Sequence, residues 1–207
     1  MTSRFNMEAF NNHIKVLVHS PKEVITEGGI VIPIEQGKGY AGAKNYNASK
    51  YAPTHGTVVS VGSGADGILV GDTVMFHFTT EETCKQQGRI EVDGDNKLFY
   101  VDSKKVMCVL RGDSLLPING WVLANRAEKA AEKTDGGIII PEAHRKESDR
   151  KFRVVSVPEG YDDVSVGDVI YTEIDCDIPL QANEFLGIVP NDLFRINIDN
   201  IVAKESE

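Results

Sequence analysis

Short runs of β-branched and aromatic residues dominate the hydrophobic pattern of this 207-residue chain. Gly, Asp and Asn separate these runs at spacings typical of an all-β barrel or sandwich. In the first half, the pattern predicts strands at residues 14–18, 57–61, 73–78, 89–92, 98–101 and 106–110. In the second half, it predicts strands at residues 121–124, 152–157, 169–173, 185–189 and 193–196. Only residues 126–133 have helical propensity, over a length too short for an independent helix. We expect either a turn of helix or an extended, mobile lead-in to Thr134 there.

One phrase occurs twice in the chain. Residues 27–33 are EGGIVIP, and residues 135–141 are DGGIIIP. Residues 55–76 also align without gaps on residues 151–172, with nine of the 22 pairs identical. About one or two identities are expected by chance at ordinary residue frequencies. A further alignment, of residues 100–109 on 187–196, extends the repeat to the strands at the end of each copy.

The repeat predicts two tandem domains of about a hundred residues each, the usual size of one domain. We expect a first domain at residues 1–112, a linker at 113–117 and a second domain at 118–207. Arg-Gly-Asp-Ser and then Pro interrupt the β pattern near the linker, so Arg111-Gly112-Asp113 is interpreted as a turn. The Val-Gly-Asp sequences at 70–72 and 166–168 are interpreted as structural turns, and residues 93–96 as a hairpin tip.

The segment at residues 33–55 has no hydrophobic period. An irregular stretch of that length in a compact domain is usually functional or disordered. The aliphatic triplet stands at its start, and an exposed triplet lowers solubility unless a partner covers it. We therefore expect binding loops at about residues 22–55 and 126–151.

Composition restricts the class of protein. Hydrophobic residues make up 41% of the chain and charged residues 26%, and the net charge is −9. The acidic balance argues against nucleic acid as a partner, because phosphate binding requires clustered Lys and Arg. The three cysteines lack CxxC spacing, and the five histidines lack ligand spacing. No apolar run has the length of a membrane helix or the form of a signal peptide, so we expect a cytoplasmic protein.

The order of the motifs resembles the co-chaperonin family of the GroES type. The layout of that family begins with a glycine pair, three aliphatic residues and a loop. A Gly-x-Val-x-x-Val-Gly strand and turn follows, and then a Val-Gly-Asp-x-Val-x-Phe segment. The resemblance covers nearly the whole chain, twice. It implies two GroES-like β-barrel domains, each with a long mobile loop that docks in a groove of the chaperonin apical domain. The residues it assigns to chaperonin binding are Gly28, Gly29, Ile30, Val31, Ile32, Gly136, Gly137, Ile138, Ile139 and Ile140.

The resemblance also implies self-association into a ring that caps a GroEL-type chaperonin during ATP-dependent folding, with ATP bound by the chaperonin. Two departures from the family are evident. Both triplets end in Ile followed by Pro, where the family usually has Leu. Only residues 62–69 and 158–165 are available for the hairpin that commonly roofs the cage. The absence of this roof, together with the longer loop after the first triplet, resembles the co-chaperonins of phages. This resemblance suggests a phage capsid protein as client in the host cytoplasm.

The tandem arrangement resembles the double-domain co-chaperonins of chloroplasts, although no transit peptide is evident. Two domains per chain do not divide evenly into the seven sites of a bacterial-type chaperonin ring. Three arrangements are compatible with this mismatch. Some domains stay unbound, or the single-domain protein of the host completes the ring, or the two domains have different roles within a ring of seven chains.

Two other classes of protein are alternatives to a co-chaperonin. Zinc alcohol dehydrogenases contain a GroES-like domain, but this chain lacks a G-x-G-x-x-G unit and a Cys/His cluster. We therefore expect no enzyme activity, cofactor or metal. The second class is a structural or virion-associated β-barrel module that has lost chaperonin binding, and the sequence leaves this alternative open. That alternative predicts that the glycine-aliphatic loops pack against their own barrel.

Overall fold

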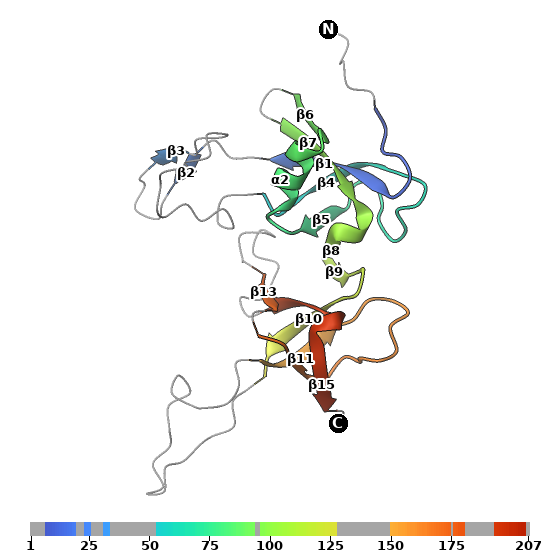
Figure 1. Cartoon of the computed structure of the whole chain (residues 1–207), viewed down its shortest axis with the longest axis vertical. Helices are drawn as coiled ribbons and strands as arrows, with labels where there is room; N and C mark the ends of the chain where they lie inside the picture. The colour runs from blue at the N-terminus through green and yellow to red at the C-terminus, as the bar shows by residue number, and fades with distance from the viewer. Residues whose placement is uncertain are drawn as a thin grey trace, which may run out of the picture. The chain divides into compact units, whose positions relative to one another are not determined.

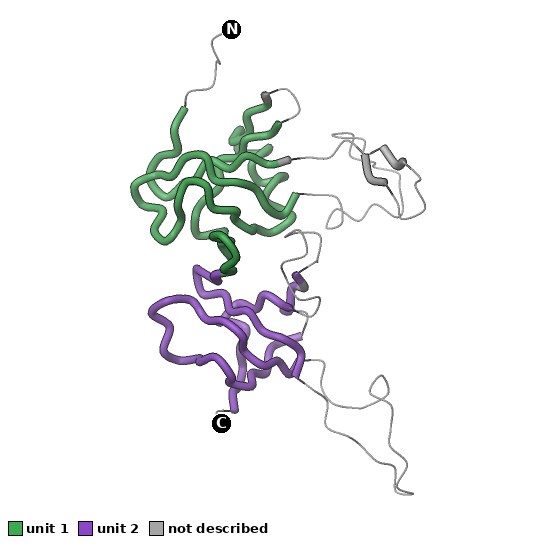
Figure 2. The backbone as a smooth tube through the Cα atoms, turned by 180° about the vertical axis from the view of Figure 1, so that it is seen from behind, with its two compact units in different colours: residues 1–115 green, residues 116–207 purple. Residues whose placement is uncertain are grey.

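A computed structural model describes residues 7–19, 23–25, 31–33, 53–93, 96–127, 150–174, 176–180 and 193–205 of the chain. The chain divides into two compact units, Met1–Leu115 and Leu116–Glu207 (Figure 2). Each unit is built on its own antiparallel sheet (Figure 1). One α-helix accompanies these sheets among the described residues, so the all-β fold class is confirmed.

The first sheet has the strand order β6-β7-β1-β4-β5-β8-β9. Its strands are β1 (His13–His19), β4 (His55–Val61), β5 (Thr73–Phe76), β6 (Ile90–Asp93), β7 (Asn96–Asp102), β8 (Val106–Arg111) and β9 (Ser114–Pro117). Burial alternates along β4, where Val58 is buried and Val59 is exposed, as expected for a strand with one face on a core. The predicted strands of the first half are confirmed, and so is the hairpin tip, because Asp93 pairs with Asn96. β9 is an additional strand.

The second sheet has the strand order β13-β14-β10-β11-β12-β15. Its strands are β10 (Trp121–Arg126), β11 (Lys151–Ser156), β12 (Val169–Thr172), β13 (Asp177–Pro179), β14 (Leu193–Asn197) and β15 (Ile201–Glu205). Four of them are predicted from the sequence, whereas β13 and β15 are not. The strand expected at residues 185–189 lies outside the described residues.

The two sheets share the same strand pairing and the same irregularities. In the first sheet Val16 pairs with Val58, and the register shifts immediately before Val16. In the second sheet Ala124 pairs with Val154, and the register shifts immediately before Ala124. A β-bulge adds local twist where it occurs, so the two strand pairs are bent at equivalent positions.

The ends of the two sheets correspond at an offset of 95 residues. The Asp102 side chain accepts a hydrogen bond from the Lys104 backbone at the start of η1 (Ser103–Lys105). The Asn197 side chain accepts the equivalent bond from Asp199 at the start of η4 (Ile198–Asn200). The sequence alignment of residues 100–109 on 187–196, with an offset of 87, is therefore wrong. Short aliphatic strands resemble one another in any register, and a cap formed by Asp in one copy and Asn in the other gives no identity.

Both cores are built around aromatic rings. In the first unit the rings of Phe76 and Phe99 are fully buried, with centroids 6.4 Å apart. In the second unit buried Phe152 meets Phe194 edge to face at 5.4 Å, and Val122, Ile170 and Ile196 complete the centre of that core. Such ring pairs contribute about 0.5–1.5 kcal/mol beyond the area that they bury.

The structure contains one helix that the sequence did not predict. α2 (Thr80–Gln86) forms where no helix was predicted, between β5 and β6. Acidic residues occupy its first turn and Lys85 its last, which favours the helix dipole, and Gly88 with φ +66° lies just beyond its end. Arg126, by contrast, is the last residue of β10. Residues 128–133 lie outside the described part of the chain.

Candidate functional site

The first glycine-aliphatic phrase ends in a small ladder of its own. β2 (Glu23–Ile25) and β3 (Val31–Pro33) pair antiparallel and belong to neither main sheet (Figure 1). Val31 and Ile32 pair with the last two residues of β2. The remaining candidate residues lie outside the described part of the chain: Gly28, Gly29, Ile30, Gly136, Gly137, Ile138, Ile139 and Ile140.

Both phrases lie in equivalent connections of the two sheets. The first occurs between His19, the end of β1, and His55, the start of β4. The second occurs between Arg126, the end of β10, and Lys151, the start of β11. β1 pairs with β4 and β10 pairs with β11, both antiparallel. The two phrases therefore leave and rejoin their sheets at corresponding strand ends.

Arg126 closes the strand end from which the second connection leaves. Its guanidinium carbon lies 5.0 Å from the ring centroid of Phe194 and 5.8 Å from that of Phe152. One of its terminal nitrogens lies 3.3 Å from Asp177 Oδ2. A cation over an aromatic face contributes about 0.5–1 kcal/mol at an exposed site. This cluster joins β10 to β11, β13 and β14 at the base of the connection.

The Val-Gly-Asp sequences form the same turn in both units, which confirms their interpretation as structural turns. The Leu69 amide donates to Asp72 Oδ2 at 2.7 Å, and the Ser165 amide donates to Asp168 Oδ2 at 3.0 Å. The carbonyl of each Asp also accepts a backbone hydrogen bond from the adjoining strand, at 2.8 Å in the first turn and 2.9 Å in the second.

Arg111 holds the first of these turns, a role that sequence reasoning missed. Its Nε donates to Asp72 Oδ1 at 2.9 Å and one terminal nitrogen to Oδ2 at 2.7 Å. The same terminal nitrogen donates to the Gly67 carbonyl at 3.0 Å. Gly112, with φ +60°, then turns the chain from β8 into β9. The Arg-Gly-Asp sequence is thus a turn whose arginine is bound to its own domain, as interpreted from the sequence.

Opposing effects act on the pKa of Asp72. Burial acts to raise this pKa, but hydrogen bonds from Arg111 and the Leu69 amide, with the positive charge of Arg111, outweigh burial and lower it. Among the described residues no arginine binds Asp168 in a bidentate manner, and Lys204 Nζ lies 3.5 Å from its Oδ2. The two turns therefore share their backbone and differ in the cation that holds them.

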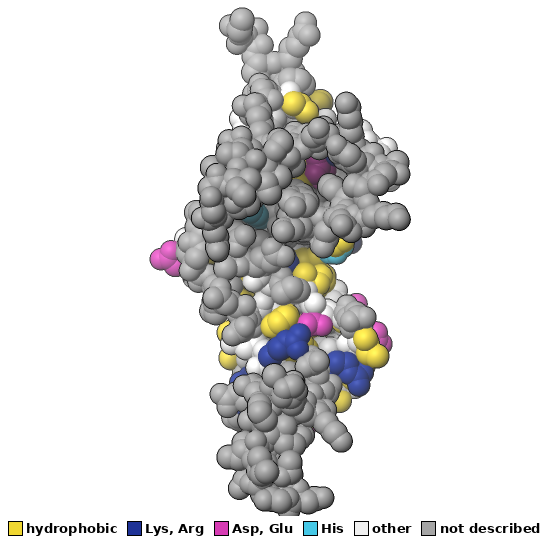
Figure 3. Space-filling view, turned by 90° about the vertical axis from the view of Figure 1, so that its left-hand side faces the viewer, with side chains coloured by type: hydrophobic (Ala, Val, Ile, Leu, Met, Phe, Trp, Pro, Cys, Tyr) yellow, Lys and Arg dark blue, Asp and Glu magenta, His cyan; other side chains and the backbone are white. Residues whose placement is uncertain are grey.

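Two kinds of feature were not found among the described residues: a cluster of metal-ligating side chains and a membrane-spanning helix. In that part of the chain, no group of His, Cys, Asp and Glu side chains is placed to hold a metal ion. Nor does it contain a helix long and apolar enough to cross a membrane. On the face drawn in Figure 3, acidic, basic and hydrophobic side chains of the second unit are interspersed.

A comparison with protein-family models identifies a known type of domain in part of the chain. Residues 114–186 match the model of the family described as chaperonin 10 Kd subunit, or Cpn10. The matched range begins at β9, continues past β13 and includes the second glycine-aliphatic phrase. A comparison with curated proteins gives no match. A GroES-type co-chaperonin domain is therefore present in the second half of the chain.

This domain supports a co-chaperonin-like role in general. The family implies partnership with a GroEL-type chaperonin and oligomerisation. Co-chaperonins of this family are not enzymes, which is consistent with the absence of a catalytic motif in the sequence.

Proposed function

We propose that the chain is a tandem co-chaperonin in which both units are GroES-like and both glycine-aliphatic phrases bind a chaperonin. The anchors would be Ile30 to Ile32 in the first unit and Ile138 to Ile140 in the second. The chain would act in the cytoplasm as part of a ring, without a cofactor of its own, while the chaperonin binds ATP. A phage capsid protein is the client that we propose.

The observation that carries the proposal is the shared position of the two phrases. Each lies between the same two strands of its sheet, and each is followed by the same Val-Gly-Asp turn. The Cpn10 match includes the second phrase but not the first. The equivalent strand pairing extends the argument from the second unit to the first.

The physical basis of capping would be many weak contacts acting together. A segment that orders only on binding loses conformational entropy, which weakens each single contact. Several such segments on one ring multiply their affinities, because the later contacts form at a high effective concentration. Weak individual contacts then permit release when the nucleotide state of the chaperonin changes.

The test is ATP-dependent association with a purified GroEL-type chaperonin, followed by electron-microscopy reconstruction. The variants Val31→Asp and Ile139→Asp, singly and together, place a charge in the proposed anchors and should weaken capping. Val70→Asp and Val166→Asp are matched controls, because these valines are about two-thirds exposed in turns outside the phrases. Circular dichroism would establish that all variants stay folded.

Density for residues 30–32 or 138–140 in the apical grooves would support the proposal and count the binding segments in each ring. Unchanged capping by the folded double variant would contradict the assignment of the anchors. A wild-type chain that does not associate with any GroEL-type chaperonin would favour a structural β-barrel module.

A further inference from the structure

The first unit contains an addition that the second unit lacks. Residues 77–89 connect β5 to β6 and include α2, whereas only residues 173–176 connect β12 to β13. α2 is not needed for the strand pairing that the two units share. It also lies outside the range 114–186 of the Cpn10 match.

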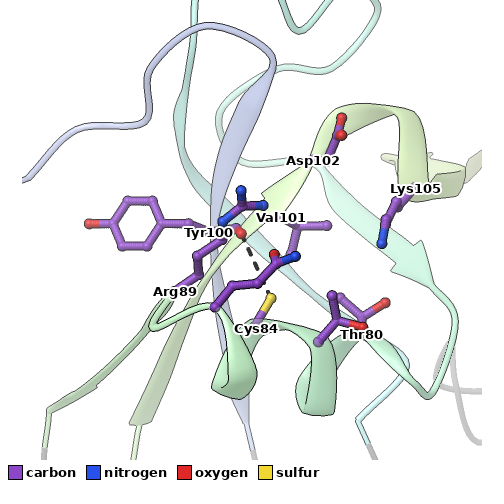
Figure 4. Close-up of a pocket in the computed structure, with 9 residues that line it drawn as sticks. Thr80, Cys84, Arg89, Tyr100, Val101, Asp102 and Lys105 are labelled. Carbon is purple, nitrogen blue, oxygen red and sulfur yellow. Dashed lines mark hydrogen bonds between the residues drawn. The ribbon is translucent and has the colours of Figure 1, made fainter.

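α2 is fixed on β7 by specific contacts. Glu81 Oε1 of α2 lies 2.8 Å from Lys97 Nζ of β7. The Cys84 thiol donates a hydrogen bond of 3.7 Å to the Tyr100 carbonyl, drawn as a dashed line in Figure 4. The Tyr100 amide donates in turn to the Arg89 carbonyl at 3.0 Å. The helix thus stands at a defined position beside the strand.

A cavity of about 190 Å³ opens between α2 and β7 (Figure 4). It is smaller than the roughly 300–1,000 Å³ of sites for drug-sized ligands, so its volume suits a small group. Its lining is formed by Thr80, Thr83, Cys84, Gln87, Arg89, Tyr100, Val101, Asp102 and Lys105.

Two cations converge on this cavity. Figure 4 shows Arg89 and Lys105 on opposite sides, above the helix that carries Cys84. Within the described part of the chain, neither cation has an ion pair or a side-chain hydrogen bond. Burial raises the pKa of the Cys84 thiol, and the negative charge of Glu81 adds to this rise, while the positive charges of Arg89 and Lys105 act in the opposite direction. Both charges are therefore close enough to act at the helix wall of the cavity.

The helix also contributes a hydroxyl group to the wall of the cavity. Thr80 lines the cavity and is 4% exposed. A threonine hydroxyl can donate one hydrogen bond to a ligand oxygen. The single acidic side chain of the lining, Asp102, accepts from the Lys104 amide at 3.1 Å. Two cations and one carboxylate therefore line the cavity.

We propose that this cavity is a binding site for a small tetrahedral oxyanion of the phosphate class. Such an ion offers acceptor oxygens in several directions and carries up to two negative charges. Arg89 donates to it from one side and Lys105 from the other, with the Thr80 hydroxyl from the helix. Guanidinium groups match phosphate geometry, and an ammonium group adds a point charge.

The test is isothermal titration calorimetry of the full chain with inorganic phosphate, at fixed ionic strength with chloride as the balancing anion. The wild-type chain should bind one phosphate per chain. Arg89→Gln and Lys105→Gln should each weaken binding at least about tenfold, because each removes a charge-assisted hydrogen bond. Thr80→Val, which keeps the side-chain shape, should weaken binding by about threefold or more.

Lys104→Gln is the matched control. It removes the same charge as Lys105→Gln but from the adjacent residue, which does not line the cavity. The contact of Lys104 with the cap of η1 is made by its backbone amide, which the substitution keeps. Its affinity for phosphate should stay within about twofold of the wild-type value. Equal losses in Lys104→Gln and Lys105→Gln would overturn the site in favour of general surface charge. So would the absence of saturable binding by the wild-type chain up to about 20 mM phosphate.

A parallel titration with AMP distinguishes the source of the oxyanion. Binding of AMP that depends on Arg89 and Lys105 would support a site for a phosphoryl group carried by a larger molecule. Binding of phosphate alone, with the same dependence, would support a site for the free anion.

Discussion

Lys15 and Glu91 form an ion pair on the first sheet, with 3.0 Å between Nζ and Oε2, and both side chains are less than a tenth exposed. Lys15 Nζ also donates to the Met7 carbonyl at 3.1 Å. The Tyr100 hydroxyl donates to Glu91 Oε1 at 2.5 Å. Burial acts to lower the pKa of Lys15, but the hydrogen bonds and charges of Tyr100 and Glu91 outweigh it, and the pKa is raised. The ammonium group therefore stays charged at neutral pH.

In the second sheet, leucines occupy the two positions that are equivalent to Lys15 and Glu91. Lys15 pairs with Tyr100, and Leu123 pairs with Arg195 one repeat later. Leu180, which donates its amide to the Leu193 carbonyl, occupies the position of Glu91. Leu123 and Leu180 are 2% and 1% exposed. The same fold thus accommodates an ion pair in one copy and apolar side chains in the other.

We predict that removing one member of the pair destabilises the first unit more than removing both. Lys15→Leu alone leaves the Glu91 carboxylate buried without its cation, which should cost about 3–5 kcal/mol. Lys15→Leu together with Glu91→Leu introduces the two leucines that the second unit has at these positions. The free energy of unfolding of this double variant should lie within about 1 kcal/mol of the wild-type value. Urea denaturation of each variant measures the free energies of unfolding.

Both single variants and the double variant complete a double-mutant cycle, which isolates the coupling between the two side chains. A matched control in the second unit is Leu123→Ala, which removes packing without changing charge. A double variant as unstable as Lys15→Leu would show that the ion pair itself, and not the unpaired charge, determines stability.

The clamp of Arg111 on Asp72 predicts a pH dependence on the acid side. The pKa of Asp72 is lower in the folded chain than its ordinary value of 3.8. A lowered pKa contributes stability that is present above the unfolded value and is lost as pH falls through the folded value. The difference in free energy of unfolding between wild type and Asp72→Asn should therefore be constant near pH 6. It should shrink below about pH 4.

Asp168→Asn is the control for that experiment, because Asp168 has the same backbone contacts and no bidentate arginine. It should cost less stability at pH 6 than Asp72→Asn does. A gap between wild type and Asp72→Asn that widens on acidification would contradict the sign of the pKa shift.

The cysteines predict a simple pattern of thiol reactivity. Cys84 and Cys108 are buried, and burial raises the pKa of Cys84, so less of the reactive thiolate is present. Cys176 is partly exposed. Ellman's reagent at neutral pH should therefore modify one thiol of the native chain rapidly and all three in denaturant. Cys176→Ser should remove the rapid phase, and a rapid phase that persists in this variant would place the reactive thiol elsewhere.

The sequence predicted the long strands well, because alternation of buried and exposed positions is encoded locally. Val58 and Val59 illustrate this, since neighbours of the same type lie on opposite faces. The short strands β2, β9 and β13 have three or four residues, too few for a period to be visible. α2 was missed because seven residues are too few to form a stable helix alone, and contacts such as Glu81 with Lys97 stabilise it.

The candidate site was only partly accessible from the sequence. Repetition shows the two phrases directly, because related copies place them before the same strand. The clamp joins Arg111 to Asp72 across 39 positions, and no local pattern indicates that pairing. The cavity beside α2 is lined by Thr80 of α2, Arg89 of the connection to β6 and Lys105 of η1. Only the folded chain brings these residues together.

The two Val-Gly-Asp turns predict equal costs for the same substitution in both units. Gly71 has φ +93° and Gly167 has φ +99°, a conformation that other L-residues rarely adopt. A Cβ at either position meets no atom within 4 Å, so any cost of Ala comes from the backbone alone. Gly71→Ala and Gly167→Ala should each destabilise their unit by about 1–2 kcal/mol.

Val70→Ala and Val166→Ala are the controls, since these neighbours are 64% and 63% exposed and should change stability by less than about 0.5 kcal/mol. Urea denaturation would compare all four variants with wild type. The two glycines have similar φ angles, but among the described residues only the first turn is held by a bidentate arginine. If Gly71→Ala costs clearly less than Gly167→Ala, the Arg111 clamp does not enforce the turn and the chain there relaxes. Equal costs would indicate that the shared backbone hydrogen bonds alone fix this conformation in both units.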